Sequence, residues 1–130
     1  MHRVYLGARA EQGDVAAGLT EIRKGVRAFH VAGNVYVAPF FLNLLAQQLA
    51  RIGQVERGLA VNSDAIAAAE RTGERWYEAE LHRSKGVMLL ARGDDVGAEV
   101  ALRLAVDIAR YQEAKAFEQR AATSLARLLH

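Results

Sequence analysis

The chain has 130 residues, of which 52% are hydrophobic and 25% charged, and these ordinary proportions exclude an intrinsically disordered protein. It has no cysteine, which excludes a disulfide framework, a thiolate zinc site and a cysteine nucleophile, and a reducing, cytoplasmic location is expected. Because 17 lysines and arginines oppose 15 aspartates and glutamates, the net charge of +2 gives no strong attraction to nucleic acid or to anionic membranes.

Glycine recurs at a constant interval along the chain, at positions 13, 33, 53, 73 and 93. Glycine adopts the left-handed backbone conformation without steric cost, so it is the usual residue just beyond the C-terminus of a helix. The segments between these glycines are rich in alanine, leucine, glutamate, glutamine and arginine, which favour helix, and none alternates as a strand does. The spacing therefore predicts an all-α protein.

The predicted helices follow one another with connections of only a few residues. In chain order they span 2–12, 14–31, 36–52, 54–72, 75–92, 94–112 and 116–129. Asp94 is placed to cap the start of the sixth helix. The apolar face of that helix follows the helical spacing and consists of Ala98, Ala101, Leu102, Ala105, Val106 and Ala109. The most apolar stretch, 35–50, is shorter than the roughly 20 residues that a membrane span needs, so no membrane segment is expected.

Short connections make neighbouring helices antiparallel hairpins, and similar hairpins bury their apolar faces by stacking into a solenoid. Side chains repeat at twice the glycine interval, as Leu49 does at Leu89, and we call this doubled interval the period. The period alone fits HEAT or armadillo arrays, at about 40–47 residues, better than the roughly 34 of tetratricopeptide repeats. The order of small and large residues favours the tetratricopeptide pattern, with close contact within a hairpin at Gly86 and Ala98 and docking of the next hairpin at Ala105; the matching positions are Gly86, Gly93, Ala98, Leu102 and Ala105.

We therefore predict a single domain, 1–130, that forms an α-solenoid of about three and a half tetratricopeptide-like hairpins. The repeats span about 1–33, 34–73 and 74–113, and a terminal helix follows at 116–129. The terminal proline of the tetratricopeptide pattern is absent, and each unit is longer than the usual one. Another α-solenoid or a helical bundle is the alternative architecture.

Four segments carry a closer resemblance, at 37–46, 70–83, 102–110 and 120–128, and the most specific is 70–83, Glu70-Arg71-Thr72-Gly73-Glu74-Arg75-Trp76-Tyr77-Glu78-Ala79-Glu80-Leu81-His82-Arg83. Together they resemble the C-terminal tetratricopeptide region of large bacterial signalling proteins. Those proteins place a class III adenylyl or guanylyl cyclase domain, or a DNA-binding transcription-factor domain, before an AAA/STAND-type ATPase module. The resemblance implies a sensory or interaction domain without a catalytic residue, either as a fragment of such a protein or as a stand-alone relative.

The sequence offers little chemistry for catalysis. Gly13 and Gly18 have the spacing of a phosphate-binding loop, but Leu19 stands where that loop needs lysine, so no nucleotide cofactor is expected. The four histidines are scattered, and His82 has Glu78 one helical turn before it, which favours a salt bridge over a metal site. We predict that the chain is not an enzyme and holds no cofactor and no metal.

In a tetratricopeptide array the first helix of each hairpin lines a concave groove. Mixed polar groups with several arginines suit a peptide, because arginine binds carboxylates with two parallel hydrogen bonds. The alternative is that this face is only solvated. Counted from the small residues Ala46, Gly86 and Ala126, the residues expected in the groove are Arg3, Phe40, Asn43, Gln47, Glu80, Arg83, Val87, Arg120, Thr123 and Arg127.

Two functions follow from this groove. The first is a non-enzymatic scaffold that binds a protein or peptide and is the regulatory part of a bacterial signalling or transcription-control protein. The second is a small-molecule sensor, which an enclosed pocket lined by Phe40, Asn43 and Glu80 would favour. A homodimer through a terminal hairpin is also expected, because Val4 and Tyr5 at one end and Leu129 at the other have no polar cap. Direct binding of nucleic acid or membrane is not expected.

Overall fold

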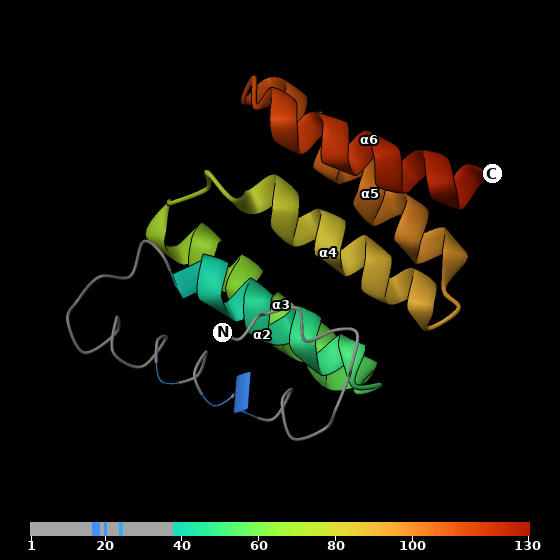
Figure 1. Cartoon of the computed structure of the whole chain (residues 1–130). Coiled ribbons are helices and arrows are strands. Elements are labelled where there is room, and N and C mark those ends of the chain that lie inside the picture. The colour runs from blue at the N-terminus through green and yellow to red at the C-terminus, as the bar shows by residue number, and fades with distance from the viewer. Residues whose placement is uncertain (1–16, 19, 21–23, 25–37) are drawn as a thin grey trace.

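The structure, a computed structural model, describes residues 17, 18, 20, 24 and 38–130. The predicted helix at 2–12, most of the helix at 14–31, and Arg3 lie outside the described residues, so the count of seven helices stays a prediction. Within the described part the protein is all-helical and has no strand, which confirms the fold class. The helices there are α2 (Ala38–Arg51), α3 (Val55–Thr72), α4 (Glu78–Ala91), α5 (Asp95–Tyr111) and α6 (Lys115–Leu129) (Figure 1).

The glycine spacing places the turns correctly. Gly53, Gly73 and Gly93 have φ angles of +87°, +76° and +93°, in the left-handed region where glycine avoids the steric cost of a side chain. As a result, the observed helices begin and end within three residues of the predicted bounds. Asp94 caps α5 as expected, because its Oδ1 accepts a hydrogen bond of 2.8 Å from the backbone N–H of Gly97.

The turn between α5 and α6 keeps the glycine interval without a glycine. Glu113 lies one such interval after Gly93 and adopts a φ of +56°. In the described part of the chain it is the only residue other than glycine with a positive φ. The backbone N–H of Ala114 donates to the carbonyl of Ala109 at 2.8 Å, as that of Asp94 does to Leu89 at 2.9 Å. The turn geometry therefore continues one step beyond the last glycine, at the cost of placing a glutamate in a left-handed conformation.

Small residues bring the two helices of the α4–α5 hairpin into close contact, as the sequence pattern predicts. A Cβ atom added at Gly86 would lie 2.6 Å from Cγ of Leu102 and 3.2 Å from the carbonyl oxygen of Ala98. The predicted apolar face of α5 is the one that is buried in the structure. Ala105 packs with Ala121 of α6, so this small side chain also admits the next helix.

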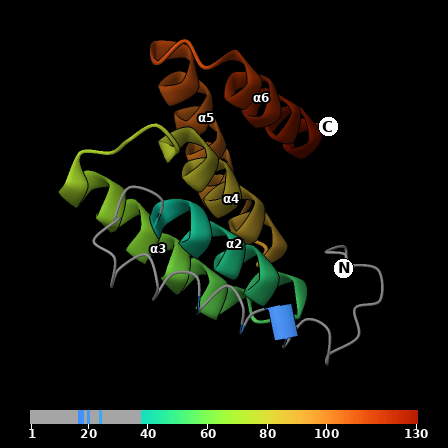
Figure 2. The same cartoon turned by 60° about the vertical axis from the view of Figure 1, so that its left-hand side comes forward.

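The five helices form two layers (Figures 1 and 2). Helix α4 contacts α2 on one side and α6 on the other, so α2, α4 and α6 lie side by side. Helix α3 packs behind this row against α2 and α4, and α5 packs behind it against α4 and α6. Helix α6 contacts neither α2 nor α3. Each described helix therefore contacts helices no more than two positions away along the chain.

One face of α6 lacks the cover that the equivalent faces have. Leu129 is 51% exposed, whereas Leu49 and Leu89, two periods and one period earlier, are 1% and 7% exposed beneath their hairpin partners. Ala126 is likewise exposed, and both Ala126 and Leu129 line a hollow of about 420 Å³ between α5 and α6. Among the described helices, none combines the length and apolar character that crossing a membrane requires.

Candidate functional site

The row formed by α2, α4 and α6 carries two adjoining hollows. The α2–α4 hollow has a volume of about 430 Å³, and the α4–α6 hollow has a volume of about 510 Å³. Arg83 lines both, so the two hollows meet at its side chain. We call this pair of hollows the groove; its described lining is Gln47, Ala50, Arg51, Arg83, Ser84, Val87, Met88 and Ala91 in the first part, and Ala116, Gln119, Arg120, Thr123, Ser124 and Arg127 in the second.

Six of the residues expected in the groove line it in the structure, and they come from all three helices of the row. They are Gln47, Arg83, Val87, Arg120, Thr123 and Arg127. The amide of Gln47 donates a hydrogen bond of 3.1 Å to the hydroxyl of Ser84, which ties α2 to α4 at the groove surface. Arg3 lies outside the described residues.

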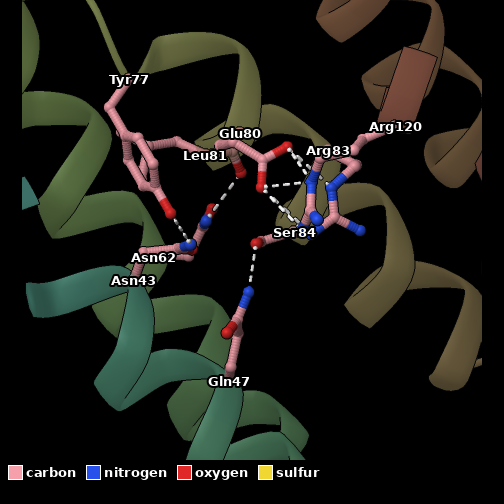
Figure 3. Close-up of polar contacts among 9 residues, drawn as sticks. All are labelled: Asn43, Gln47, Asn62, Tyr77, Glu80, Leu81, Arg83, Ser84 and Arg120. Atoms are coloured by element: carbon pink, nitrogen blue, oxygen red, sulfur yellow. Dashed lines mark hydrogen bonds and ion pairs between the residues drawn. The ribbon is translucent and has the colours of Figure 1, made fainter. Parts of the chain in front are cut away.

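Glu80 lies beneath the groove rather than on its surface (Figure 3). Its carboxylate accepts hydrogen bonds from Arg83 at 2.9 and 3.2 Å and from Nε of Arg120 at 3.2 Å. The Glu80 side chain is 4% exposed, against 15% for Arg83 and 56% for Arg120. A buried carboxylate is stable only when it is paired, and here the guanidinium groups of Arg83 on α4 and Arg120 on α6 supply the pairing. Glu80 therefore orients the arginines that reach the groove.

Asn43 and Phe40 form a second supporting cluster at one end of the row. Asn43 is fully buried, and its amide donates to the hydroxyl of Tyr77 at 3.4 Å. The Tyr77 ring makes edge contacts with Phe40 of α2 and Phe117 of α6, with centroids 5.4 and 5.8 Å apart. Tyr77, which directly precedes α4, thus joins α2 to α6, and Asn43 and Phe40 support the groove without lining it.

A buried asparagine also fixes α3 against α4. Asn62 replaces the large apolar residue that the repeat pattern has at this position, and it is fully buried. Its Nδ2 donates to the backbone carbonyl of Leu81 at 2.9 Å (Figure 3), so the amide N–H has an acceptor on the neighbouring helix, while the buried Oδ1 of Asn62 has no hydrogen-bond partner among the described residues. This bond fixes α4, the middle helix of the groove, to α3 behind it.

Two titratable side chains near the start of α4 respond to burial. Burial raises the pKa of Tyr77 above its ordinary value, and the Asn43 hydrogen bond partly opposes that effect. Burial lowers the pKa of His82, and the carboxylate of Glu78 partly offsets the shift. The expected salt bridge between His82 and Glu78 is replaced by another, since Glu78 accepts two hydrogen bonds from Arg75 at 3.1 and 2.6 Å.

Sequence reasoning missed eight of the fourteen described lining residues, Arg51 and Ser84 among them, and it also missed the supporting ring of Tyr77. Arg51 lies one turn after Gln47 on the same face of α2, so the i, i+4 spacing was the available signal. Ser84 lines the groove beside Arg83. Tyr77 lies one period before Phe117, and this aromatic pair at the repeat interval could have indicated a shared position.

The chemistry available in the groove follows from its described lining. The described lining offers guanidinium, amide and hydroxyl donors together with aliphatic side chains, and it includes neither a carboxylate nor a histidine. The buried carboxylate below is already held by two arginines. A general acid or base needs a titratable group within reach of a ligand, and the described residues bring none to the groove surface.

These observations define an all-helical protein, within the described residues, that has a groove across one row of helices. No family model matches the chain, and no solved structure matches it. The chain is 33% identical over 122 residues to an uncharacterized protein of Rhizobium meliloti (strain 1021). That alignment takes in 93% of this chain but 12% of the relative, so the chain spans about an eighth of the relative's length.

Proposed function

We propose that the chain is a tetratricopeptide-like α-solenoid whose groove binds a protein or peptide without catalysing a reaction. The observation that carries this proposal is the pair of hollows that meet at Arg83 and extend across α2, α4 and α6. A surface that crosses three helices from successive hairpins suits an extended ligand, because such a ligand contacts several repeats at once.

Two features of the fold support the solenoid. The described helices contact only near neighbours along the chain, as stacked hairpins do, whereas a bundle around one axis brings distant helices together. The turns recur at a constant interval, at Gly53, Gly73, Gly93 and Glu113, and α4 and α5 begin one full period after α2 and α3. Helices α2 and α3 lie within the proposed repeat 34–73, and α4 and α5 lie within the proposed repeat 74–113.

The longer relative supports a role as one module of a larger protein. Its matching region is a small fraction of its length, which is the arrangement expected when a binding domain serves attached domains. We propose that the groove is the sensory or regulatory part of a cytoplasmic bacterial signalling or transcription-control protein.

A small-molecule sensor is the second candidate, favoured by hollows of about 430 and 510 Å³, a size that accommodates a metabolite. The peptide is the better supported ligand for two reasons. Both hollows open to solvent, and neither is lined by Phe40, Asn43 or Glu80, the residues that an enclosed pocket would use.

We also propose that the chain forms a homodimer through its last described helices, α5 and α6. The open face of α6, defined by Ala126 and Leu129 with their neighbours on α5, is the surface we assign to it. Light scattering of the wild type across micromolar concentrations gives the mass, and Leu129→Glu should lower it. A monomer mass at every concentration would contradict the homodimer.

Affinity capture from a lysate of the source organism tests the groove. The double variant Arg51→Glu/Arg127→Glu changes two exposed groove residues that form no ion pair with the described residues, so its fold should be unchanged. We expect it to lose the captured proteins, because two reversed charges repel whatever the wild-type groove attracts.

The matched control is Arg57→Glu/Arg71→Glu, which makes the same change in charge on α3, away from the groove and from the open face of α6. It should retain the captured set. If the groove variant retains the set and the control loses it, the binding surface lies on the other layer and the proposal is wrong.

A further inference from the structure

The groove concentrates the positive charge of the molecule. Four arginines line it, Arg51, Arg83, Arg120 and Arg127, whereas no carboxylate is part of its described lining. With the carboxylate of Glu80 beneath them, these groups carry a net charge of +3. Because the whole chain carries +2, all other residues together carry −1. The positive field is therefore a property of this surface and not of the protein at large.

Glu80 leaves most of the arginine donors available. A guanidinium group has five N–H bonds. Arg83 directs Nε and Nη2 at the carboxylate, and Arg120 directs the same two atoms. The remaining N–H groups of both side chains can donate to a second anion. Since Glu80 already holds the two side chains in place, a ligand loses less side-chain entropy when it binds them.

Arg127 adds an uncompensated charge to the same hollow. It lies two turns after Arg120 along the same face of α6, and it forms no ion pair with any described residue. The α4–α6 hollow therefore gathers three guanidinium groups above one buried carboxylate. Paired guanidinium groups are the usual partners of carboxylates in protein recognition.

The α2–α4 hollow has a different lining. Val87, Met88, Ala50 and Ala91 give it an aliphatic surface, with Arg51 at its edge. Neither hollow has an aromatic ring in its described lining, and stacking rings are what single-stranded nucleic acid uses. An aliphatic hollow beside a basic hollow matches a peptide that carries both kinds of side chain.

We propose that the ligand is an acidic peptide segment, with an aliphatic side chain in the α2–α4 hollow and carboxylates on Arg83, Arg120 and Arg127 in the α4–α6 hollow. This inference rests on the proposed function and adds the chemical class of the ligand. It also assigns the α4–α6 hollow as the part of the groove that selects for negative charge.

Fluorescence anisotropy with a defined probe tests the inference. The probe is a fluorescein-labelled peptide of about twelve residues, with two leucines followed by three glutamates in a glycine–serine background. Its matched control carries three glutamines in place of the glutamates. At low salt the glutamate peptide should bind about tenfold more tightly, as expected for three partly exposed ion pairs. Added salt should reduce this preference.

Two variants locate the preference. Arg120→Gln/Arg127→Gln should bind both peptides with equal affinity, because Arg83 remains compensated by Glu80. The control variant Arg71→Gln changes an exposed arginine of α3 outside both the groove and the α5–α6 hollow, and it should retain the wild-type preference. Circular dichroism checks that each variant is folded.

The outcomes separate this inference from the proposed function. Equal affinity of the wild type for the two peptides, or no measurable binding of either, overturns the acidic-peptide assignment, while the lysate capture still decides whether the groove binds proteins. A single-stranded oligonucleotide that binds as tightly as the glutamate peptide also overturns it, because the hollow would then attract any polyanion. A glutamate preference that survives Arg120→Gln/Arg127→Gln places the selective site elsewhere.

Discussion

Gly86→Ala tests whether close helix contact maintains the hairpin behind the groove. The new methyl group would lie 2.6 Å from Cγ and 2.8 Å from Cδ2 of Leu102, and 3.2 Å from a backbone carbonyl oxygen. Leu102 is 1% exposed, so its side chain has little space to move. Overpacking costs about 1–3 kcal/mol, and the upper end applies because the crowded Leu102 atom is a branch point. Alanine returns about 1 kcal/mol of helix propensity. We expect a net loss of about 2 kcal/mol.

Urea denaturation measures this loss. Trp76, the single tryptophan, begins the α4 hairpin and reports its unfolding by fluorescence, while circular dichroism reports all helices. The two transitions should coincide if unfolding is two-state. The background Leu102→Ala provides the control, because it removes the crowded side chain.

In that background, Gly86→Ala should be neutral or stabilising by up to about 1 kcal/mol, so the double-mutant cycle should give a coupling of about 2–3 kcal/mol. An equal loss of stability in both backgrounds would refute the steric explanation. A gain in stability in the wild-type background would show that the helices have room for a methyl group and are packed less closely than described.

Three further predictions concern single residues. Glu113→Gly should raise the free energy of unfolding by about 0.5–1 kcal/mol in urea denaturation, because it removes a side chain from a left-handed turn; a decrease would contradict the turn geometry. Glu80→Gln should lower the free energy of unfolding by about 1–3 kcal/mol through the loss of charge-assisted hydrogen bonds, whereas Glu99→Gln on the exposed face of α5 should change it by less than about 0.5 kcal/mol; equal effects would show that burial of Glu80 is irrelevant. Burial lowers the pKa of His82 in the folded protein, so on acidification the unfolded chain takes up a proton first. The free energy of unfolding should therefore fall as the pH drops through 6.5, the ordinary pKa of histidine. His82→Gln should lack this part of the decrease, between about pH 7.5 and about pH 5.5. An unchanged pH dependence in that variant would refute the assignment.

Local signals were enough to predict the helices. Gly53, Gly73 and Gly93 end helices for a steric reason that depends on the residue itself, and so their spacing predicts the boundaries. The buried face of α5 follows from the helical spacing of small and apolar residues. The turn at Glu113 had no such signal, since a glutamate in a left-handed conformation is fixed by the packing on either side of it.

Depth below the surface could not be predicted in the same way. Helical spacing predicts the direction in which a side chain points. For Asn43 and Glu80 it correctly predicted that the side chains belong to the row of α2, α4 and α6. Whether a neighbouring helix covers that side chain depends on residues far along the chain. Two residues from later in the chain cover these side chains. Arg120, one period after Glu80, pairs with the Glu80 carboxylate, and Tyr77, just before α4, accepts a hydrogen bond from Asn43. Glu80 and Asn43 therefore support the groove from below, although the sequence placed them on its surface.

The Glu80–Arg120 ion pair also determines how the groove responds to ionic strength. It spans one structural period and ties α4 to α6 at the base of the hollow, with Arg120 more than half exposed to water. Added electrolyte screens this tie at the same time as it screens an acidic ligand. We expect the groove to widen as its attraction for the ligand weakens. The affinity should therefore decline with salt more steeply than screening of the ligand's own contacts alone would cause. Ionic strength should therefore change the width of the groove together with its affinity for the ligand.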